Sequence, residues 1–180
     1  YPAAYTPYTV YHIWADGETV FCTGPEGTVV SLDGAGDEDW RVHDTGTLDD
    51  LQDVWGLGAD DVWVAGGPTG LLHWDGVAWS AMEWPDPGDP SDPCQDQPVI
   101  DLWGAEGTLY FATSSTLVEW DGTDFTVLLH WPRTEYDMGG GWMNCTEAPT
   151  ISAIWGNGPD ELYVAVRDPG HVTPECGEEH

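Results

Sequence analysis

The fold is decided by residues 51–79, which read LQDVWGLGADDVWVAGGPTGLLHWDGVAW. Short runs rich in Val, Leu and Trp alternate with runs of Gly, Asp and Pro, a pattern typical of brief β-strands separated by turns. The last two runs flank Asp75-Gly76, and Asp-Gly between such runs favours a two-residue type I′ hairpin. The segment therefore predicts four antiparallel strands, at residues 51–55, 61–66, 70–74 and 78–82.

The same pattern recurs along the chain. The ten residues LLHWDGVAWS at 71–80 return as LVEWDGTDFT at 117–126. Four related runs can be aligned on an anchor tryptophan, and the anchors are separated by 41, 48 and 52 residues. A repeat of about forty residues, lengthened by insertions, accounts for these separations. The anchors are Trp14, Trp55, Trp103 and Trp155, and the units span about 11–50, 51–98, 99–150 and 151–180.

Four strands per repeat of about forty residues is the blade of a β-propeller. We therefore predict one all-β domain over residues 1–180, built from four four-stranded blade repeats. A complete ring and part of a larger ring both stay open. In the run 61–66, Val62 and Val64 alternate with Trp63 and Ala65, so both faces of the strand are apolar, as expected of a sheet buried on both sides. We expect Trp63 and the anchor tryptophans to pack between blades.

The two ends of the chain differ from the repeat. Unit four supplies two strands and then runs into DPGHVTPECGEEH at 168–180, which has no Asp-Gly hairpin. Residues 1–10 precede unit one where an outer strand would stand, and Pro2 and Pro7 are tolerated on a sheet edge. We expect this segment to complete a blade, either in this chain or in a neighbouring one, because an open edge promotes aggregation.

The run 51–79 resembles the Trp-Gly-rich propeller repeats of secreted and surface proteins of myxobacteria. It is more loosely similar to tectonin repeats and to the Asp-box propellers of sialidases. The resemblance covers units two and three well, unit one in part, and the first half of unit four. It implies the propeller fold and an extracellular setting. It does not imply one activity, because such repeats occur in lectins, scaffolds and enzymes.

Charge excludes several classes of partner. The chain carries 33 Asp and Glu against three Arg and no Lys, a net charge of −30. Such a protein repels phosphate backbones and anionic lipids, so we expect no nucleic-acid binding. No apolar run approaches the ~20 residues that span a bilayer, so we expect no membrane insertion.

Cysteine usage indicates an oxidising compartment. The four cysteines form no Cys-x-x-Cys pair, which favours disulfides over a zinc site and places the protein outside the cell or on its surface. Cys94 and Cys145 lie in the links that follow units two and three, on one rim of neighbouring blades, and we expect them to be bonded. Cys22 and Cys176 form a less defined pair.

Two expanded links, at 84–98 and 131–149, lie on one rim of the predicted propeller. Loops on a rigid scaffold commonly carry recognition, so we expect a protein or glycan to bind there. The alternative is that the loop tryptophans only cover the core. The candidate ligand-binding residues are Trp84, Trp131, Tyr136 and Trp142.

Two acidic segments, DGAGDED at 33–39 and DPGDPSD at 86–92, offer the oxygen ligands that calcium prefers. Neither has the spacing of an EF-hand loop, and the alternative is a solvated acidic loop. We expect no required cofactor, with calcium as the candidate ion. Its candidate ligands are Asp33, Asp37, Asp39, Asp86, Asp89 and Asp92.

These observations favour a secreted or surface propeller that acts as a protein-binding or assembly module, including self-assembly through blade edges. A lectin that uses the rim tryptophans is the alternative. We expect no enzyme, because the sequence contains no metalloprotease, nucleophile-elbow or phosphate-loop motif. The least favoured reading is a sialidase-like glycoside hydrolase, which would need all three arginines, Arg41, Arg133 and Arg167, with Tyr136 beside Glu135.

Overall fold

The structure, a computed structural model, describes residues 8–34, 40–67, 70–85, 98–131, 134–137, 143–146, 149–158 and 161–167. Within these ranges every helix or strand element is a β-strand. Three antiparallel four-stranded sheets follow one another along the chain, each with its strands in sequence order. The chain is therefore all-β, and its sheets are the blades of a β-propeller fold, as predicted.

The strands of the three complete blades match the repeat units. Blade one consists of β1 (His12–Ala15), β2 (Thr19–Thr23), β3 (Val29–Asp33) and β4 (Arg41–His43). Blade two consists of β5 (Asp53–Gly58), β6 (Asp61–Gly66), β7 (Gly70–Trp74) and β8 (Trp79–Ala81). Blade three consists of β9 (Asp101–Ala105), β10 (Thr108–Ala112), β11 (Thr116–Trp120) and β12 (Phe125–His130).

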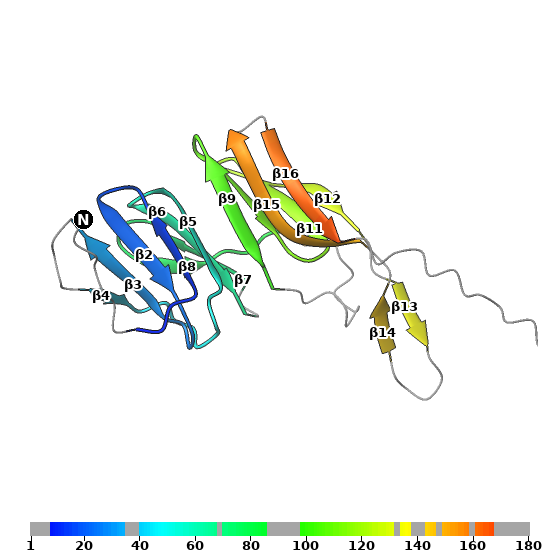
Figure 1. The fold of residues 1–180 in the computed structure, drawn as a ribbon, viewed down its shortest axis with the longest axis horizontal. Coiled ribbons are helices and arrows are strands. Elements are labelled where there is room, and N and C mark those ends of the chain that lie inside the picture. Colours follow the sequence, from blue (N-terminus) through cyan, green and yellow to red (C-terminus); the bar gives the residue numbers. More distant parts are fainter. Residues whose placement is uncertain are drawn as a thin grey trace, which may run out of the picture.

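The fourth blade is represented by two long strands, β15 (Thr150–Gly158) and β16 (Glu161–Arg167), which pair with each other. The link 131–149, expected to be a loop, contains a small hairpin of β13 (Thr134–Asp137) and β14 (Met143–Thr146), which lies outside the row of blades (Figure 1). Residues 1–7 and 168–180 lie outside the described residues, so the predicted outer strand stays a prediction.

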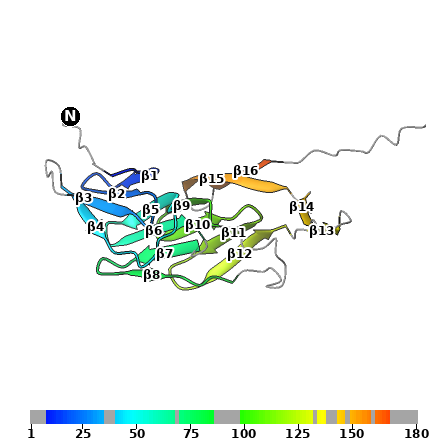
Figure 2. The ribbon, with the colours of Figure 1, turned by 90° about the horizontal axis from the view of Figure 1, so that it is seen from below.

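The blades stand side by side in a row (Figure 2). Their first strands are neighbours: β1 lies beside β5, β5 beside β9, and β9 beside β15. The second strands also contact the following blade, since β6 reaches β9 and β10 reaches β15. Blade contacts are therefore concentrated at the first two strands of each unit.

Strand β6 shows how the core forms between blades. Val62 and Val64 pack in one apolar cluster with Phe21 of blade one, while Trp63 and Ala65 pack in another with residues of blade three. All four β6 side chains are fully buried. The prediction that this strand is covered on both faces is confirmed.

The Asp-Gly hairpins form, but their turn type differs from the prediction. Positive φ occurs at Gly76 (86°) and not at Asp75, whereas a type I′ turn needs it at both. Strand β7 ends at Trp74 and β8 begins at Trp79, so the loop has four residues. The Asp75 Oδ1 accepts the N–H groups of Val77 and Ala78, at 2.9 and 2.8 Å. This carboxylate satisfies the turn donors and makes the longer loop favourable.

Candidate functional site

Each complete blade presents an aromatic pair to the blade that follows it. The pair consists of the anchor tryptophan on the first strand and the residue opposite it on the second strand. The second-strand rings are all buried, and the anchors are buried or half-buried. The three pairs are Trp14 with Phe21, Trp55 with Trp63, and Trp103 with Tyr110.

The following blade receives the anchor tryptophan on a glycine. Trp14 packs on Gly56, where an added Cβ would lie less than 3.0 Å from three ring atoms, and Trp103 packs in the same way on Gly156. At the middle interface the Trp55 Nε1 lies 3.1 Å from the corresponding position on Gly104. Each of these glycines directly follows an anchor tryptophan. In a Trp-Gly dipeptide the tryptophan therefore packs on the following blade, while the glycine contacts the tryptophan of the preceding blade.

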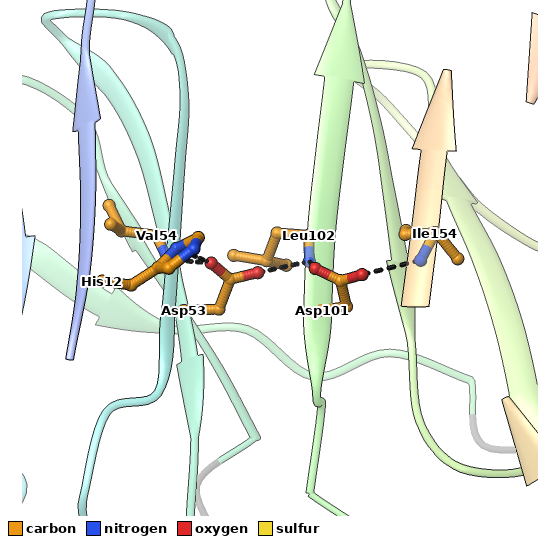
Figure 3. Close-up of polar contacts among 6 residues, drawn as sticks. All are labelled: His12, Asp53, Val54, Asp101, Leu102 and Ile154. Carbon is orange, nitrogen blue, oxygen red and sulfur yellow. Dashed lines mark hydrogen bonds and ion pairs between the residues drawn. The ribbon is translucent and has the colours of Figure 1, made fainter. Parts of the chain in front are cut away.

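Two carboxylates, that of buried Asp53 and that of half-buried Asp101, link the first strands of neighbouring blades through hydrogen bonds (Figure 3). The Leu102 N–H donates to Asp53 Oδ2 at 2.6 Å, and the Ile154 N–H donates to Asp101 Oδ2 at 2.6 Å. Each aspartate stands two residues before an anchor, and each donor stands one residue before the next anchor. A carboxylate of one blade therefore accepts a backbone N–H of the following blade. The Leu102 N–H also donates to Asp101 Oδ1 of its own strand, at 3.1 Å.

The first interface varies this arrangement. His12 occupies the position of the aspartate in unit one, and its Nδ1 contacts Asp53 Oδ1. His12 brings no carboxylate to Val54, and the Val54 N–H donates to Asp53 Oδ1 of its own strand, at 2.7 Å. The Leu102 N–H makes the same own-strand bond to Asp101, but there it adds to the bond from the preceding blade. Unit two thus supplies its own acceptor where the preceding unit has none.

Asp53 is only 3% exposed and its ionisation is perturbed. Burial raises the pKa of Asp53 to about 8, and the neighbouring Asp101 carboxylate adds to this rise, while the N–H groups of Leu102 and Val54 oppose it. Near neutral pH a substantial fraction of this side chain therefore holds a proton. A hydrogen bond to the Asp101 side chain also raises the pKa of Asp53, because such a bond favours the protonated carboxyl group.

The aromatic pair of unit four is open, which corrects the expectation that Trp155 packs between blades. Trp155 is 59% exposed and Tyr163, which pairs with it across β15 and β16, is 51% exposed. The physical reason is that the described residues include no blade beyond β16. Ala153 and Ala165 are the next pair on the same side and are also exposed. We call Ala153, Trp155, Tyr163 and Ala165 the aromatic end face.

At the opposite end of the row, no described residue covers the exposed side of β1, and blade one lacks the features of a receiving blade. Ile13, at the position of Val54 and Leu102, is 62% exposed. Ala15 stands where the other units have the receiving glycine. Unit one therefore differs from units two to four at the residue on which a tryptophan would rest.

A cavity of about 480 Å³ lies between blades one and two. The guanidinium of Arg41, the first residue of β4, stands 5.3 Å from the centre of the Trp74 ring. Buried His43 lies 2.8 Å, through Nε2, from Ser31 Oγ, and burial followed by the nearby Arg41 charge lowers the pKa of His43 to about 4. The cavity is lined by Phe21, Ser31, Asp33, Arg41, His43, Ala59, Asp60, Trp74 and Gly76.

Of the predicted rim aromatics, Trp84 and Trp131 do not line this cavity. Trp84 is half-buried against Phe111, with ring centres 5.3 Å apart, and Trp131 is half-buried against the cluster between blades three and four. Tyr136 lies in β13, and Trp142 lies outside the described residues. A binding role for these four residues stays a prediction.

The predicted calcium and disulfide sites fall mostly outside the described residues. Asp33 is exposed at the end of β3, whereas Asp37, Asp39, Asp86, Asp89 and Asp92 are not described. In the described ranges no group of three or more His, Cys, Asp or Glu side chains is placed to hold a metal ion. Cys94 and Cys176 are likewise not described, Cys145 lies in β14, and Cys22 is a buried free thiol.

Comparisons with known proteins add little beyond this geometry. No family model matches the chain, and no curated protein matches it. The solved structure of YCF48 bound to D1 peptide is similar over 89% of this chain, with 17% sequence identity and a TM-score of 0.49. The chain spans 62% of the length of that structure. Among the described residues no helix could cross a lipid bilayer.

The sequence analysis did not predict the hydrogen bonds that Asp53 and Asp101 accept from the following blades, nor the glycines on which the anchor tryptophans rest. Their signal was present in DVWG at 53–56 and DLWG at 101–104, which repeat an Asp two residues before the anchor and a Gly one after it. The exceptions, His12 and Ala15 in unit one and Ala153 in unit four, mark the two ends of the row.

Proposed function

We propose that this chain is a protein-binding and assembly module, and that its aromatic end face contacts another protein. The observation that carries the proposal is the exposure of Trp155 and Tyr163, whose counterparts in the first three units are all covered by a following blade. Covering the open rings would remove on the order of 200 Å² from water, an area worth ~5 kcal/mol. Because association itself costs several kcal/mol, the partner must cover more of β15 and β16 than the two rings.

The proposal includes a non-catalytic role and an extracellular or cell-surface location. The resemblance to secreted propeller repeats and the cysteine usage support the location. The strong negative charge supports partners other than nucleic acids. Calcium stays a candidate ion for the acidic segments around Asp33 and at 86–92.

The assembly role can be tested in the cells that produce the protein. The tagged chain is recovered under native conditions and the mass of the recovered particle is measured by light scattering. We expect a particle heavier than one protomer, which Trp155→Ser reduces. The matched control is Leu128→Ser on β12, which also removes an exposed apolar side chain but lies away from the aromatic end face. Recovery of the unaltered chain as a lone protomer would contradict the assembly role.

Carbohydrate binding is the second candidate, and the cavity between blades one and two favours it. Asp33, Asp60 and Arg41 line this cavity beside Trp74, and carboxylates and a guanidinium are groups that bind sugar hydroxyls. A glycan array should then show saturable binding that Asp60→Ala weakens, whereas a rim site would respond to Trp131→Ala. A blank array would remove this candidate.

Sialidase-like hydrolysis is the third candidate and has the least support. It needs three arginines that converge on one carboxylate, whereas Arg41 stacks on Trp74 between blades one and two and Arg167 ends β16 of blade four. Arg133 lies outside the described residues. Release of sialic acid by the purified chain would restore this candidate.

A further inference from the structure

We propose that the aromatic end face binds a further blade of the same repeat type, one that carries glycine directly after its anchor position. This inference rests on the assembly function proposed above and names the partner of that site. Three interfaces inside the chain use one design, in which an aromatic pair faces the next blade and the anchor rests on its first strand. The aromatic end face continues this series, since it presents the fourth such pair in the same strand register.

The anchor ring itself requires the glycine. A Cβ at Gly56 or Gly156 would lie less than 3.0 Å from three atoms of the tryptophan ring that rests there, a distance that real Cβ atoms essentially never show. The contact is made by the far edge of a rigid, packed indole, so the clash is relieved only if the ring leaves its position or the strands move apart. A blade that binds Trp155 in the same register must therefore present glycine at this point.

A second copy of this chain does not meet the requirement. Its first blade would present Ala15, whose Cβ occupies the space that the Trp155 ring needs. Ala153 also lacks the carboxylate that would accept the N–H of Ile13, as Asp101 accepts that of Ile154. Both repeated contacts are missing, so the same argument opposes closure of the four units into their own ring.

Ala153 also predicts a feature of the incoming blade. Because unit four offers no acceptor, the backbone N–H before the new anchor must be satisfied within the incoming blade. Unit two solves this problem at the first interface, where Asp53 accepts the N–H of Val54 on its own strand. The partner blade is therefore expected to read Asp-x-Trp-Gly on its first strand, as residues 53–56 do.

The test extends the full chain at its C-terminus with a second copy of residues 51–98, which contain such a strand. Hydroxyl-radical footprinting with mass spectrometry then measures the oxidation of Trp155. We expect oxidation to fall from the level of a ring that is 59% exposed toward that of Trp103, which is 4% exposed. The matched control carries Gly56→Ala in the appended copy alone, and there Trp155 should stay as reactive as in the unextended chain.

Equal oxidation of Trp155 in the glycine and alanine extensions would overturn the proposal. If the extended chain fails to fold, the unextended chain with Ala15→Gly and Ala153→Asp gives a second test, because both missing contacts are then restored between copies. When each chain is purified away from other proteins, this double variant should self-associate head to tail, with a mass that rises with concentration. The unaltered chain and the Ala153→Asp variant should then stay protomeric. A protomeric double variant, or self-association of the unaltered chain through Trp155, would also overturn it.

The outcomes separate this inference from the assembly function. If particles recovered from producing cells depend on Trp155 but the appended blade does not cover it, the partner is not a blade and the assembly function stands. If the appended blade covers Trp155 but recovered particles have the protomer mass, the face fits a blade as inferred and the assembly function is wrong.

Discussion

The indole ring of Trp103 rests directly on Gly156, with no room for a side chain between the ring and the β15 backbone. This contact joins blade three to blade four and repeats the contact of Trp14 with Gly56. The stability of the contact between neighbouring blades therefore depends on glycine, the smallest residue of the repeat.

We expect Gly156→Ala to destabilise the protein by ~1–3 kcal/mol, because the added methyl group forces Trp103 or the strand to move. The matched control is Gly158→Ala on the same strand, where nothing lies within 4 Å of the added carbon. The control should be neutral or stabilising by ~0.4–1 kcal/mol, because alanine reduces the freedom of the unfolded chain. Urea unfolding measures both, and equal midpoints would contradict the packing described.

Asp53 should make stability depend on pH in an unusual direction. Its folded pKa of about 8 exceeds the ordinary value of 3.8, so between these values the folded state binds more protons than the unfolded state. The free energy of unfolding should therefore fall as pH rises through this window, by at most ~1.4 kcal/mol per pH unit. Asp53→Asn should remove this contribution, and the exposed Asp124→Asn should not. Parallel stability curves for the wild type and Asp53→Asn would disprove the assignment.

His43 should make the free energy of unfolding rise with pH below neutrality, which is opposite to the effect of Asp53. Its pKa is lowered from 6.5 to about 4, chiefly by burial, so the unfolded state binds more protons between these values. Its contribution to stability is present above pH 6.5 and is lost as pH falls toward 4. We expect His43→Gln, which retains a group able to bond Ser31, to show a flatter stability profile in this window. An unchanged acid limb, measured by urea unfolding at several pH values, would count against a neutral buried His43.

The fold could be predicted from the sequence because the anchor tryptophans and the strands around them recur about every forty to fifty residues. The alternation of Val62, Trp63, Val64 and Ala65 was enough to predict a strand buried on both faces. The turn at Asp75 was misjudged, because the dipeptide alone does not reveal that the carboxylate will accept two N–H groups and widen the loop. Trp155 was misjudged because an identical motif was assumed to have an identical neighbour. The Asp53 and Asp101 contacts depend on which strands become adjacent, and the repeated Asp in DVWG and DLWG does not by itself reveal the backbone N–H that each carboxylate accepts.

The disulfide between Cys94 and Cys145 stays a prediction from chain position. It would close a loop of about fifty residues and stabilise the fold by ~4 kcal/mol in the chain-entropy model. Peptide mapping without reductant should recover the two cysteines in one linked peptide. Alkylation of both as free thiols would end the proposal, and buried Cys22 serves as an internal reference for an unpaired thiol.

Salt should stabilise this protein strongly. With a net charge of −30, folding concentrates negative charge that counterions screen, so the melting temperature should rise with sodium chloride. Calcium at matched ionic strength should raise it further if the acidic segments bind the ion. Identical melting curves with and without calcium would remove the calcium site and leave the screening effect intact.

The anchor tryptophan of each unit packs on the glycine of the next unit, and this contact is not made in the reverse direction. The row of blades therefore has a direction. Units two to four all carry the receiving glycine, so each of them can accept the tryptophan ring of a preceding unit. Unit one carries Ala15 at the corresponding point, so it cannot receive a preceding tryptophan ring through the same contact. One methyl group at residue 15 thereby sets unit one apart from the three units that follow it.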